Sequence, residues 1–306
     1  MAYKLAPDEG LRDGLQRGAR EQLDLAVDEL STGVSEDPVE AVHDARKALK
    51  KTRALLRLGR AAIDPDVRRR ENAALRDTGR SLSCARDAEV MVEAVEELSE
   101  RFAGRVPQAT FDAVRGHLEA ERDQARQRLL ESGLADQAAE ELKAARRRLA
   151  GARLRQGGWK ALEPGLVRSY RRGAAALAVA REKPTVENLH EWRKRTKDLW
   201  YHLRLLKPLS PGIVGGQAEE AHRISELLGD DHDLAVLRES LRSGAYDLPI
   251  DLDAVIELID HRRSQLQSEA LRAGRRVYAE RPKAFRRRLR RYWRTWRRAP
   301  RSAAIA

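Results

Sequence analysis

Two segments of this sequence place a histidine ahead of basic residues at helical spacing. At about 100° per residue, each set falls within one sector of roughly 100° on a helix. The sets are His43, Arg46, Lys47 and Lys50 in the first segment, and His190, Arg193, Lys194 and Lys197 in the second. Ammonium and guanidinium groups donate charged hydrogen bonds to anionic oxygens, and arginine can engage two oxygens at once. The chemistry that this spacing suits is therefore anion binding.

Each basic stripe continues along its helix, with Arg57 in the first segment and Arg204 in the second. Apolar and small residues recur every three or four positions on the opposite faces, which is typical of a buried helix face. They are Ala45, Leu49, Thr52 and Leu56 in the first segment, and Trp192, Thr196, Leu199, Leu203 and Leu206 in the second. We expect packing to turn both stripes away from the core.

The two segments belong to an internal repeat with an offset of 147 positions. Downstream, LSCARD (82–87) aligns with LGDDHD (228–233); upstream, Gly10-Leu11 and Arg17-Gly18 resemble Gly165-Leu166 and Arg172-Gly173. Matches in the same order predict a duplicated helical unit that is too long for a solenoid repeat. We expect two similar helical bundles, residues 1–156 and 157–306, which meet near Gly157-Gly158 and can still pack as one body.

A single basic stripe is usually a solvated helix face, but its recurrence in both halves favours a shared ligand. Like charges at i, i+4 repel by a few tenths of a kcal/mol, a cost that a bound anion offsets. Cationic neighbours should lower the pKa of His43 and His190, and a polyanion should raise it. The pattern thus predicts an affinity that rises as the pH falls through the histidine range.

Composition sets the broad class of the chain. Lys and Arg outnumber Asp and Glu by 60 to 48, an excess that attracts anions. A single cysteine, Cys84, excludes an intrachain disulfide framework and a cysteine zinc cluster, which favours a cytoplasmic protein. We expect Cys84 itself to be a small residue of the core. Neither a signal sequence nor a membrane-spanning apolar run is present. Helical periodicity predicts a nearly all-α fold, with helix boundaries at Pro38, Pro65, Pro107, Gly157-Gly158, Pro164, Pro184, 208–212, Pro249 and Pro282.

The sequence resembles the CHAD family, the conserved histidine α-helical domain, over nearly its whole length. The segments that carry the resemblance are VHDARKALKKTRALLRL (42–58), LSCARDAEV (82–90), LHEWRKRTKDLWYHLRLL (189–206) and LGDDHDLAVL (228–237). The resemblance implies two bundles related by a pseudo-twofold axis, with a basic groove or pore between them that binds inorganic polyphosphate. It also implies association with cytoplasmic polyphosphate granules and no cofactor.

Carried over by position, the resemblance makes each histidine and the three basic residues after it phosphate contacts, extended by Arg57 and Arg204. Arg17 and Arg172 are weaker candidates, because they recur outside the central motif. Ser83 occupies the position that Gly229 has in the second half, so we expect a differently shaped turn there. Many relatives carry a triphosphate-tunnel (CYTH) domain built of strands, and no such strands are expected here, so we expect a binding module and no catalysis.

Two other functions compete with this interpretation. The first is an HD-type metal phosphohydrolase, which the dipeptide His232-Asp233 resembles, with His202, His222, Asp230 and Asp231 nearby in sequence. The simpler role for Asp87 and Asp233 is to cap a helix or to pair with an arginine. The segment 283–298 interleaves arginines with aromatic residues, which favours nucleic-acid binding. Its aromatic residues recur every three to four positions, which predicts that they form a buried helix face. We therefore expect nucleic-acid binding that is at most weak and sensitive to salt.

Overall fold

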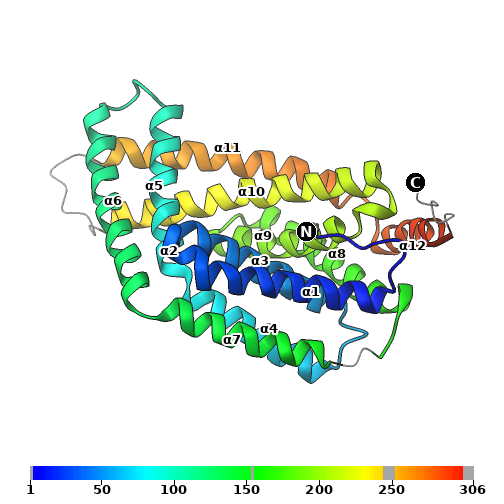
Figure 1. The fold of residues 1–306 in the computed structure, drawn as a ribbon. Helices are drawn as coiled ribbons and strands as arrows, with labels where there is room; N and C mark the ends of the chain where they lie inside the picture. Colours follow the sequence, from blue (N-terminus) through cyan, green and yellow to red (C-terminus); the bar gives the residue numbers. More distant parts are fainter. Residues whose placement is uncertain (1–2, 153–154, 244–251, 299–306) are drawn as a thin grey trace, which may run out of the picture.

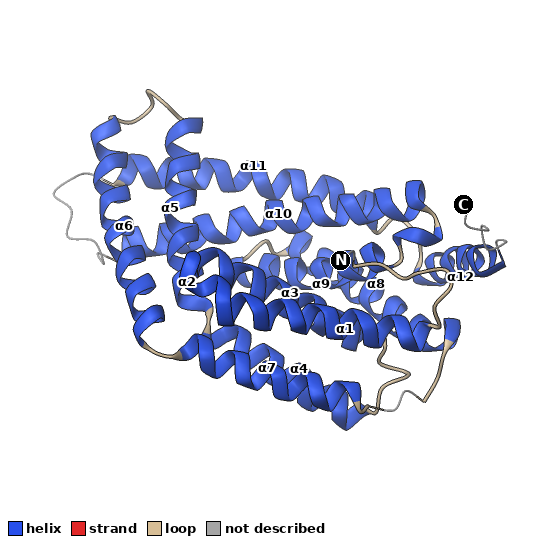
Figure 2. Cartoon of the chain, in the orientation of Figure 1, coloured by secondary structure: helices blue, strands red, loops and turns tan. Residues whose placement is uncertain are grey.

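The computed structural model describes residues 3–152, 155–243 and 252–298, and every secondary-structure element among them is helical (Figure 2). The predicted all-α class is confirmed. Within these residues, no helix is both long and apolar enough to cross a membrane. The helix boundary predicted at Pro249 and the core role predicted for the Cys84 side chain lie outside the described part of the chain.

The helices follow one another through short connections (Figure 1). Their bounds are α1 (Leu11–Asp28), η1 (Glu29–Gly33), α2 (Val34–Glu36), α3 (Pro38–Leu58), α4 (Pro65–Ser81), α5 (Ser83–Arg101), α6 (Gln108–Glu131), α7 (Leu134–Ala150), α8 (Gly158–Glu182), α9 (Val186–Leu205), η2 (Lys207–Leu209), α10 (Pro211–Arg242), α11 (Asp253–Val277) and α12 (Pro282–Arg298).

The two helices with the basic stripes, α3 and α9, both begin at a capped residue. The side chain of Asp37 accepts hydrogen bonds from the backbone N–H groups of Val39 and Glu40, and Thr185 accepts one from Asn188. These bonds satisfy N–H groups that have no partner within the helix. The caps fix where each helix starts and therefore which face its basic residues share.

Several predicted boundaries are confirmed and others are wrong. Proline opens α3, α4, α10 and α12, where a missing N–H costs nothing. Pro164 does not end a helix: it lies inside α8, on an exposed position where the ring meets solvent. The LGDDHD segment does not open a helix either, because α10 runs through it without a break. Its counterpart does start α5, so the two halves differ there by more than the predicted change in the shape of a turn.

The core joins the two predicted halves. One apolar cluster runs from α1, α3 and α7 into α8, α9 and α12, and a second joins α5 and α6 to α10 and α11. Figure 1 shows α5 and α6 across one end of the long α10–α11 pair, with α12 at the other end. The chain therefore packs as one body, and its division into duplicated units at residue 156 stays a prediction.

The predicted buried faces of α3 and α9 are confirmed. Every residue assigned to them is at most 2% exposed. His202 links these two helices to α8: its Nδ1 lies 2.8 Å from Ser169 Oγ and its Nε2 lies 2.9 Å from the Ala54 carbonyl oxygen. Burial lowers the pKa of His202 to about 4, so this fully buried imidazole is neutral at physiological pH. A neutral histidine can make both contacts without burying a charge.

The crossing of α3 and α8 depends on Gly165. A Cβ atom built on Gly165 would lie 2.1 Å from the Leu58 carbonyl oxygen, which is a backbone atom that cannot turn away. Only glycine allows the two helices to approach this closely.

We predict that Gly165→Ala destabilises the fold by about 1–3 kcal/mol or more, because α3 and α8 must separate. Urea unfolding followed by circular dichroism measures the change. Gly116→Ala is the matched control: a Cβ there meets nothing within 4 Å, so alanine should stabilise α6 by about 0.5–1 kcal/mol. A Gly165→Ala protein as stable as the original would contradict the described crossing.

Candidate anion-binding site

Two adjoining cavities lie where α3 and α9 meet α5 and α10. The first, with a volume of about 670 Å³, includes His43 and is called the His43-side cavity. The second, of about 540 Å³, includes His190 and is called the His190-side cavity. Their common wall is made of Arg46, Lys50, Asp87, Val90, Arg193, Lys197, Tyr201 and Asp233. A shared wall of this kind makes them two parts of one basic hollow.

Most of the predicted contacts come together in this hollow. His43 and Lys47 line the His43-side cavity only, and Arg57, His190 and Lys194 line the His190-side cavity only. The four basic residues in the common wall come equally from α3 and α9. The two stripes therefore face one hollow from two helices.

Arg204 and Arg172 lie beside the hollow and not in its walls. The Arg204 guanidinium lies 5.8 Å from the ring centre of Trp200, which lines the His43-side cavity. Arg172 lies 3.8 Å from a carboxylate oxygen of Glu191. Glu191 also pairs with Lys194, at 2.9 Å, on the rim of the His190-side cavity.

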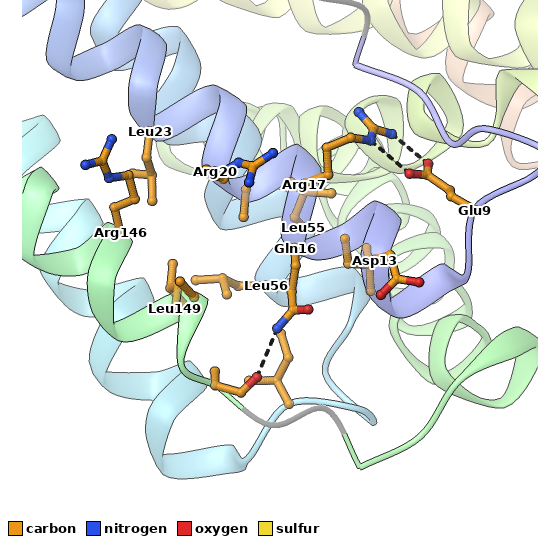
Figure 3. A pocket seen from close by; sticks show the side chains of 15 residues that line it. Glu9, Asp13, Gln16, Arg17, Arg20, Leu23, Leu55, Leu56, Arg146 and Leu149 are labelled. Carbon is orange, nitrogen blue, oxygen red and sulfur yellow. Dashed lines mark hydrogen bonds and ion pairs between the residues drawn. The ribbon is translucent and has the colours of Figure 1, made fainter.

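Arg17 is not brought to the hollow with the other candidates. It lines a separate cavity of about 410 Å³ between α1, α3 and α7. Figure 3 shows its guanidinium bound to Glu9, at 2.6 Å, and a second pair joins it to Glu21 at 3.2 Å. Recurrence of an Arg-Gly pair in the sequence carried no information about these carboxylate partners.

Neighbouring helices hold the two arginines of the common wall. Arg46 donates to the Ser83 carbonyl oxygen at 3.1 Å and to an Asp87 oxygen at 3.3 Å. Arg193 donates from Nε to the Ser225 carbonyl oxygen at 3.1 Å. Gly229 makes room for Arg193, because a Cβ there would lie 2.6 Å from its Nη2 atom. Both guanidinium groups keep further N–H donors for a ligand.

The two lysines of the common wall form no ion pair within the described residues. Burial, reinforced by Lys197 and Arg46, lowers the pKa of Lys50 to about 7. Burial, reinforced by Arg193, lowers the pKa of Lys197 to about 8. The Lys50 side chain is itself exposed to water, so the desolvation comes from the surrounding walls of the hollow and not from exclusion of all water. An anion placed here would restore the charged form of both lysines.

The histidines are neutral in the empty hollow. Burial, with the nearby Arg86 and Lys47, lowers the pKa of His43. Burial and the adjacent His232, whose ring centre is 4.3 Å away, lower the pKa of His190 to about 4. The direction is as expected, but the leading cause is burial. Among the basic residues predicted as contacts, Lys50 and Lys197 have pKa values closer to neutral pH than His190 has, so we extend the predicted link between affinity and pH to these two lysines.

Carboxylates also reach the hollow, and the roles predicted for Asp87 and Asp233 are confirmed only in part. Asp87 and Asp233 lie inside α5 and α10, so neither caps a helix, although Asp87 does pair with Arg46. Burial raises the pKa of Asp233, and raises that of Asp230 to about 6. Both acids sit in low-solvent surroundings that weaken their ionised, anion-repelling form.

Sequence reasoning also missed basic residues of the His190-side cavity, namely Arg53 and Arg195. Arg53 follows Lys50 by one helical turn, but the 147-residue offset aligns it with Trp200, so the repeat gave no signal for it. Arg195 lies one turn from Glu191 and pairs with that carboxylate. Only the packing of α3 against α9 reveals that both point into the same cavity.

Two of the residues grouped in the metal-hydrolase alternative lie outside the hollow. His202 is buried between α3 and α8, and Asp231 is held by Arg263 at 3.0 Å and Gln267 at 2.8 Å. The other four line the hollow, namely His222, Asp230, His232 and Asp233. In the described ranges, no three His, Cys, Asp or Glu residues form a group that could hold a metal ion.

The aromatic face of the C-terminal helix is buried, as predicted. Phe285, Leu289 and Trp293 of α12 are at most 7% exposed and pack against α8. The Phe285 ring stacks on Tyr170 with centres 4.0 Å apart. The most buried aromatics of this helix are therefore unavailable for stacking on bases, and arginines dominate its outer surface.

We predict that Lys50 titrates several pH units below an ordinary lysine, because the walls of the hollow and its basic neighbours disfavour the ammonium form. NMR spectra of protein labelled at lysine side-chain carbons, recorded from pH 5 to 11, measure this directly. A Lys50→Arg variant identifies the signal by its loss. Titration of Lys50 only above pH 10 would contradict the described surroundings.

Comparison with known proteins agrees with this architecture. Among solved structures, PptA from Streptomyces chartreusis has a TM-score of 0.62 at 16% identity, covering 89% of this chain and 98% of that one. The CHAD domain from the plant Ricinus communis has a TM-score of 0.52 at 18% identity, covering 92% and 96%. No curated protein shows significant sequence similarity. The CHAD domain model matches residues 17–242, and the chain therefore belongs to the CHAD domain family.

Proposed function

We propose that this protein binds inorganic polyphosphate in the hollow between α3 and α9. The observation that carries the proposal is the common wall, where Arg46, Lys50, Arg193 and Lys197 meet from two helices. Neither lysine has a carboxylate partner among the described residues, and each arginine keeps free donors. A chain of phosphates would supply the missing negative charge along the whole wall. Membership of the CHAD family supports the same ligand.

The shape of the hollow favours polyphosphate over nucleic acid. Cavities of about 540 and 670 Å³ suit a thin, flexible chain, whereas a nucleic-acid duplex is too wide to enter them. A single strand would need free aromatic rings on which to stack its bases. Trp200 does not offer one, because His222 and Tyr201 lie against its ring with centres 4.0 and 4.4 Å away.

The residues of the hollow have different roles in this proposal. The four basic residues of the common wall contact phosphate, and Lys47, Arg57 and Lys194 bind the chain where it leaves each cavity. His43 and His190 line the walls as neutral groups that can donate hydrogen bonds. We propose binding without hydrolysis, in the cytoplasm and in association with polyphosphate granules.

Weak nucleic-acid binding is the second candidate, and α12 is the feature that favours it. This helix carries outward arginines on a surface that no cavity encloses, at positions 287, 290, 291 and 294. Such a surface attracts any polyanion without reading its sequence, and the attraction falls steeply with salt. We expect polyphosphate to displace DNA from the protein at physiological salt.

We predict that changing Arg46, Lys50, Arg193 and Lys197 together to glutamine weakens polyphosphate binding by at least about 100-fold. Hydrogen bonds to charged groups contribute about 1.5–3 kcal/mol each. Even if water replaces two of the four lost bonds, the other two cost at least about 3 kcal/mol, which corresponds to more than a 100-fold loss of affinity. Competition titrations of graded polyphosphates against DNA at several salt concentrations measure the effect.

The matched control removes the same charge elsewhere, by changing Arg126, Arg128, Arg147 and Arg242 to glutamine. These arginines are exposed on α6, α7 and α10 and lie outside both cavities. The control should bind polyphosphate nearly as well as the original protein. Equal losses in both variants would show that net charge alone governs binding, and DNA that wins at physiological salt would overturn the proposal.

A further inference from the structure

Four arginines gather outside the hollow, on the side of the His190-side cavity. Arg60 follows α3, Arg68 lies on α4, and Arg168 and Arg172 lie on α8. We call them the outer arginine cluster. None of them lines either cavity, and only Arg172 was considered as a ligand contact from the sequence.

The packing of α3 against α4 brings Arg60 and Arg68 together. The Asn72 side-chain oxygen of α4 accepts hydrogen bonds from Arg57 at 3.1 Å and from Arg53 at 3.4 Å. Because α3 and α4 form an antiparallel pair, moving one turn beyond this contact leads to Arg60 on one side and Arg68 on the other. The cluster thus begins directly next to Arg57, which lines the His190-side cavity.

The close approach of α8 to α3 adds the other two arginines. Gly165 meets the Leu58 carbonyl oxygen at a distance that admits no Cβ atom. Arg168 and Arg172 follow Gly165 by three and seven positions, so both lie on the face of α8 that carries this contact. Arg60 is two residues beyond Leu58. The three elements therefore place their arginines around one point.

This cluster holds little compensating negative charge. Within the described residues, Arg60, Arg68 and Arg168 form no ion pair, and the buried Nε of Arg68 has no hydrogen-bond partner. After burial, the charges that lower the pKa of Arg60 are Arg168, Arg68 and Arg172. Glu191, the one carboxylate paired with Arg172, is shared with Lys194 and Arg195. Gathering like charges in this way costs free energy unless an anion is bound.

A continuous line of basic residues joins the cluster to the cavity. Arg172 shares Glu191 with Arg195, which lines the His190-side cavity. On the other side, Arg57 lines the same cavity and pairs with Asp198 at 2.7 Å. A linear anion that leaves this cavity therefore meets positive charge on α3, α4, α8 and α9, and the carboxylates beside its path, Glu191 and Asp198, are themselves paired with arginines.

We propose that the outer arginine cluster is a second binding station for the same polyphosphate chain, which it holds after the chain leaves the His190-side cavity. The inference rests on the proposed function of the hollow. A chain long enough to reach both stations gains affinity by binding the second one intramolecularly, whereas a short chain occupies the hollow alone. The cluster thereby makes the protein selective for long chains.

The test compares tripolyphosphate with long-chain polyphosphate by calorimetric titration at several salt concentrations. In the test variant, Arg60, Arg68 and Arg168 are changed to glutamine, and Arg172 is kept because it touches Glu191 at the cavity rim. The matched control changes Arg126, Arg128 and Arg242 to glutamine, with the same loss of charge. Circular dichroism and thermal unfolding establish that both variants fold as the original protein does.

We expect the test variant to lose about tenfold or more in affinity for long chains, with a salt dependence shallower by about 0.7 per lost phosphate contact. Its affinity for tripolyphosphate should stay within about twofold of the original. An unchanged affinity for long chains would overturn the second station, as would an equal loss for both chain lengths. If the original protein bound neither ligand, the proposed function itself would fail, and the two failures are thereby distinguished.

Discussion

Mutual repulsion among the basic residues of the common wall is the constraint around which this molecule is organised. Arg46 and Lys50 of α3 face Arg193 and Lys197 of α9, and the helices that carry them cannot move apart without opening the core. Burial and neighbouring charges disfavour the ammonium form of two of these groups, lowering the pKa of Lys50 to about 7 and that of Lys197 to about 8. The empty hollow is a place where positive charge is held at a cost, and an anion offsets that cost.

The rest of the fold keeps those charges in place. Caps at Asp37 and Thr185 fix the start of each stripe, and the neutral His202 ties α3, α8 and α9 together behind it. Gly165 allows α8 to touch α3, and Gly229 leaves room for the Arg193 guanidinium. Asp37 lies outside both cavities and the other devices are neutral, so none cancels the charge of the hollow. The hydrophobic core stabilises the fold, and the basic residues of the common wall remain available to bind an anion.

Much of this arrangement could be predicted from the sequence, because it follows from helical periodicity. The spacing of residues such as Leu49 and Trp192 identified the buried faces correctly, and the recurring His-Arg-Lys pattern identified most of the wall. What could not be predicted depends on contacts between distant segments. Arg17 recurs with Arg172 yet pairs with Glu9 in another cavity, and Asp233 lies in mid-helix where a cap was expected. Neither fact has a signature in local spacing.

An anion bound in the hollow should restore charge to a wall that is partly deprotonated when empty. Calorimetric titration with polyphosphate at pH 8, in two buffers with different ionisation heats, measures the protons taken up on binding. With the pKa values of Lys50 and Lys197 near 7 and 8, we predict an uptake of about one to two protons, falling towards zero when both lysines are changed to arginine. Tight binding without proton uptake would contradict it.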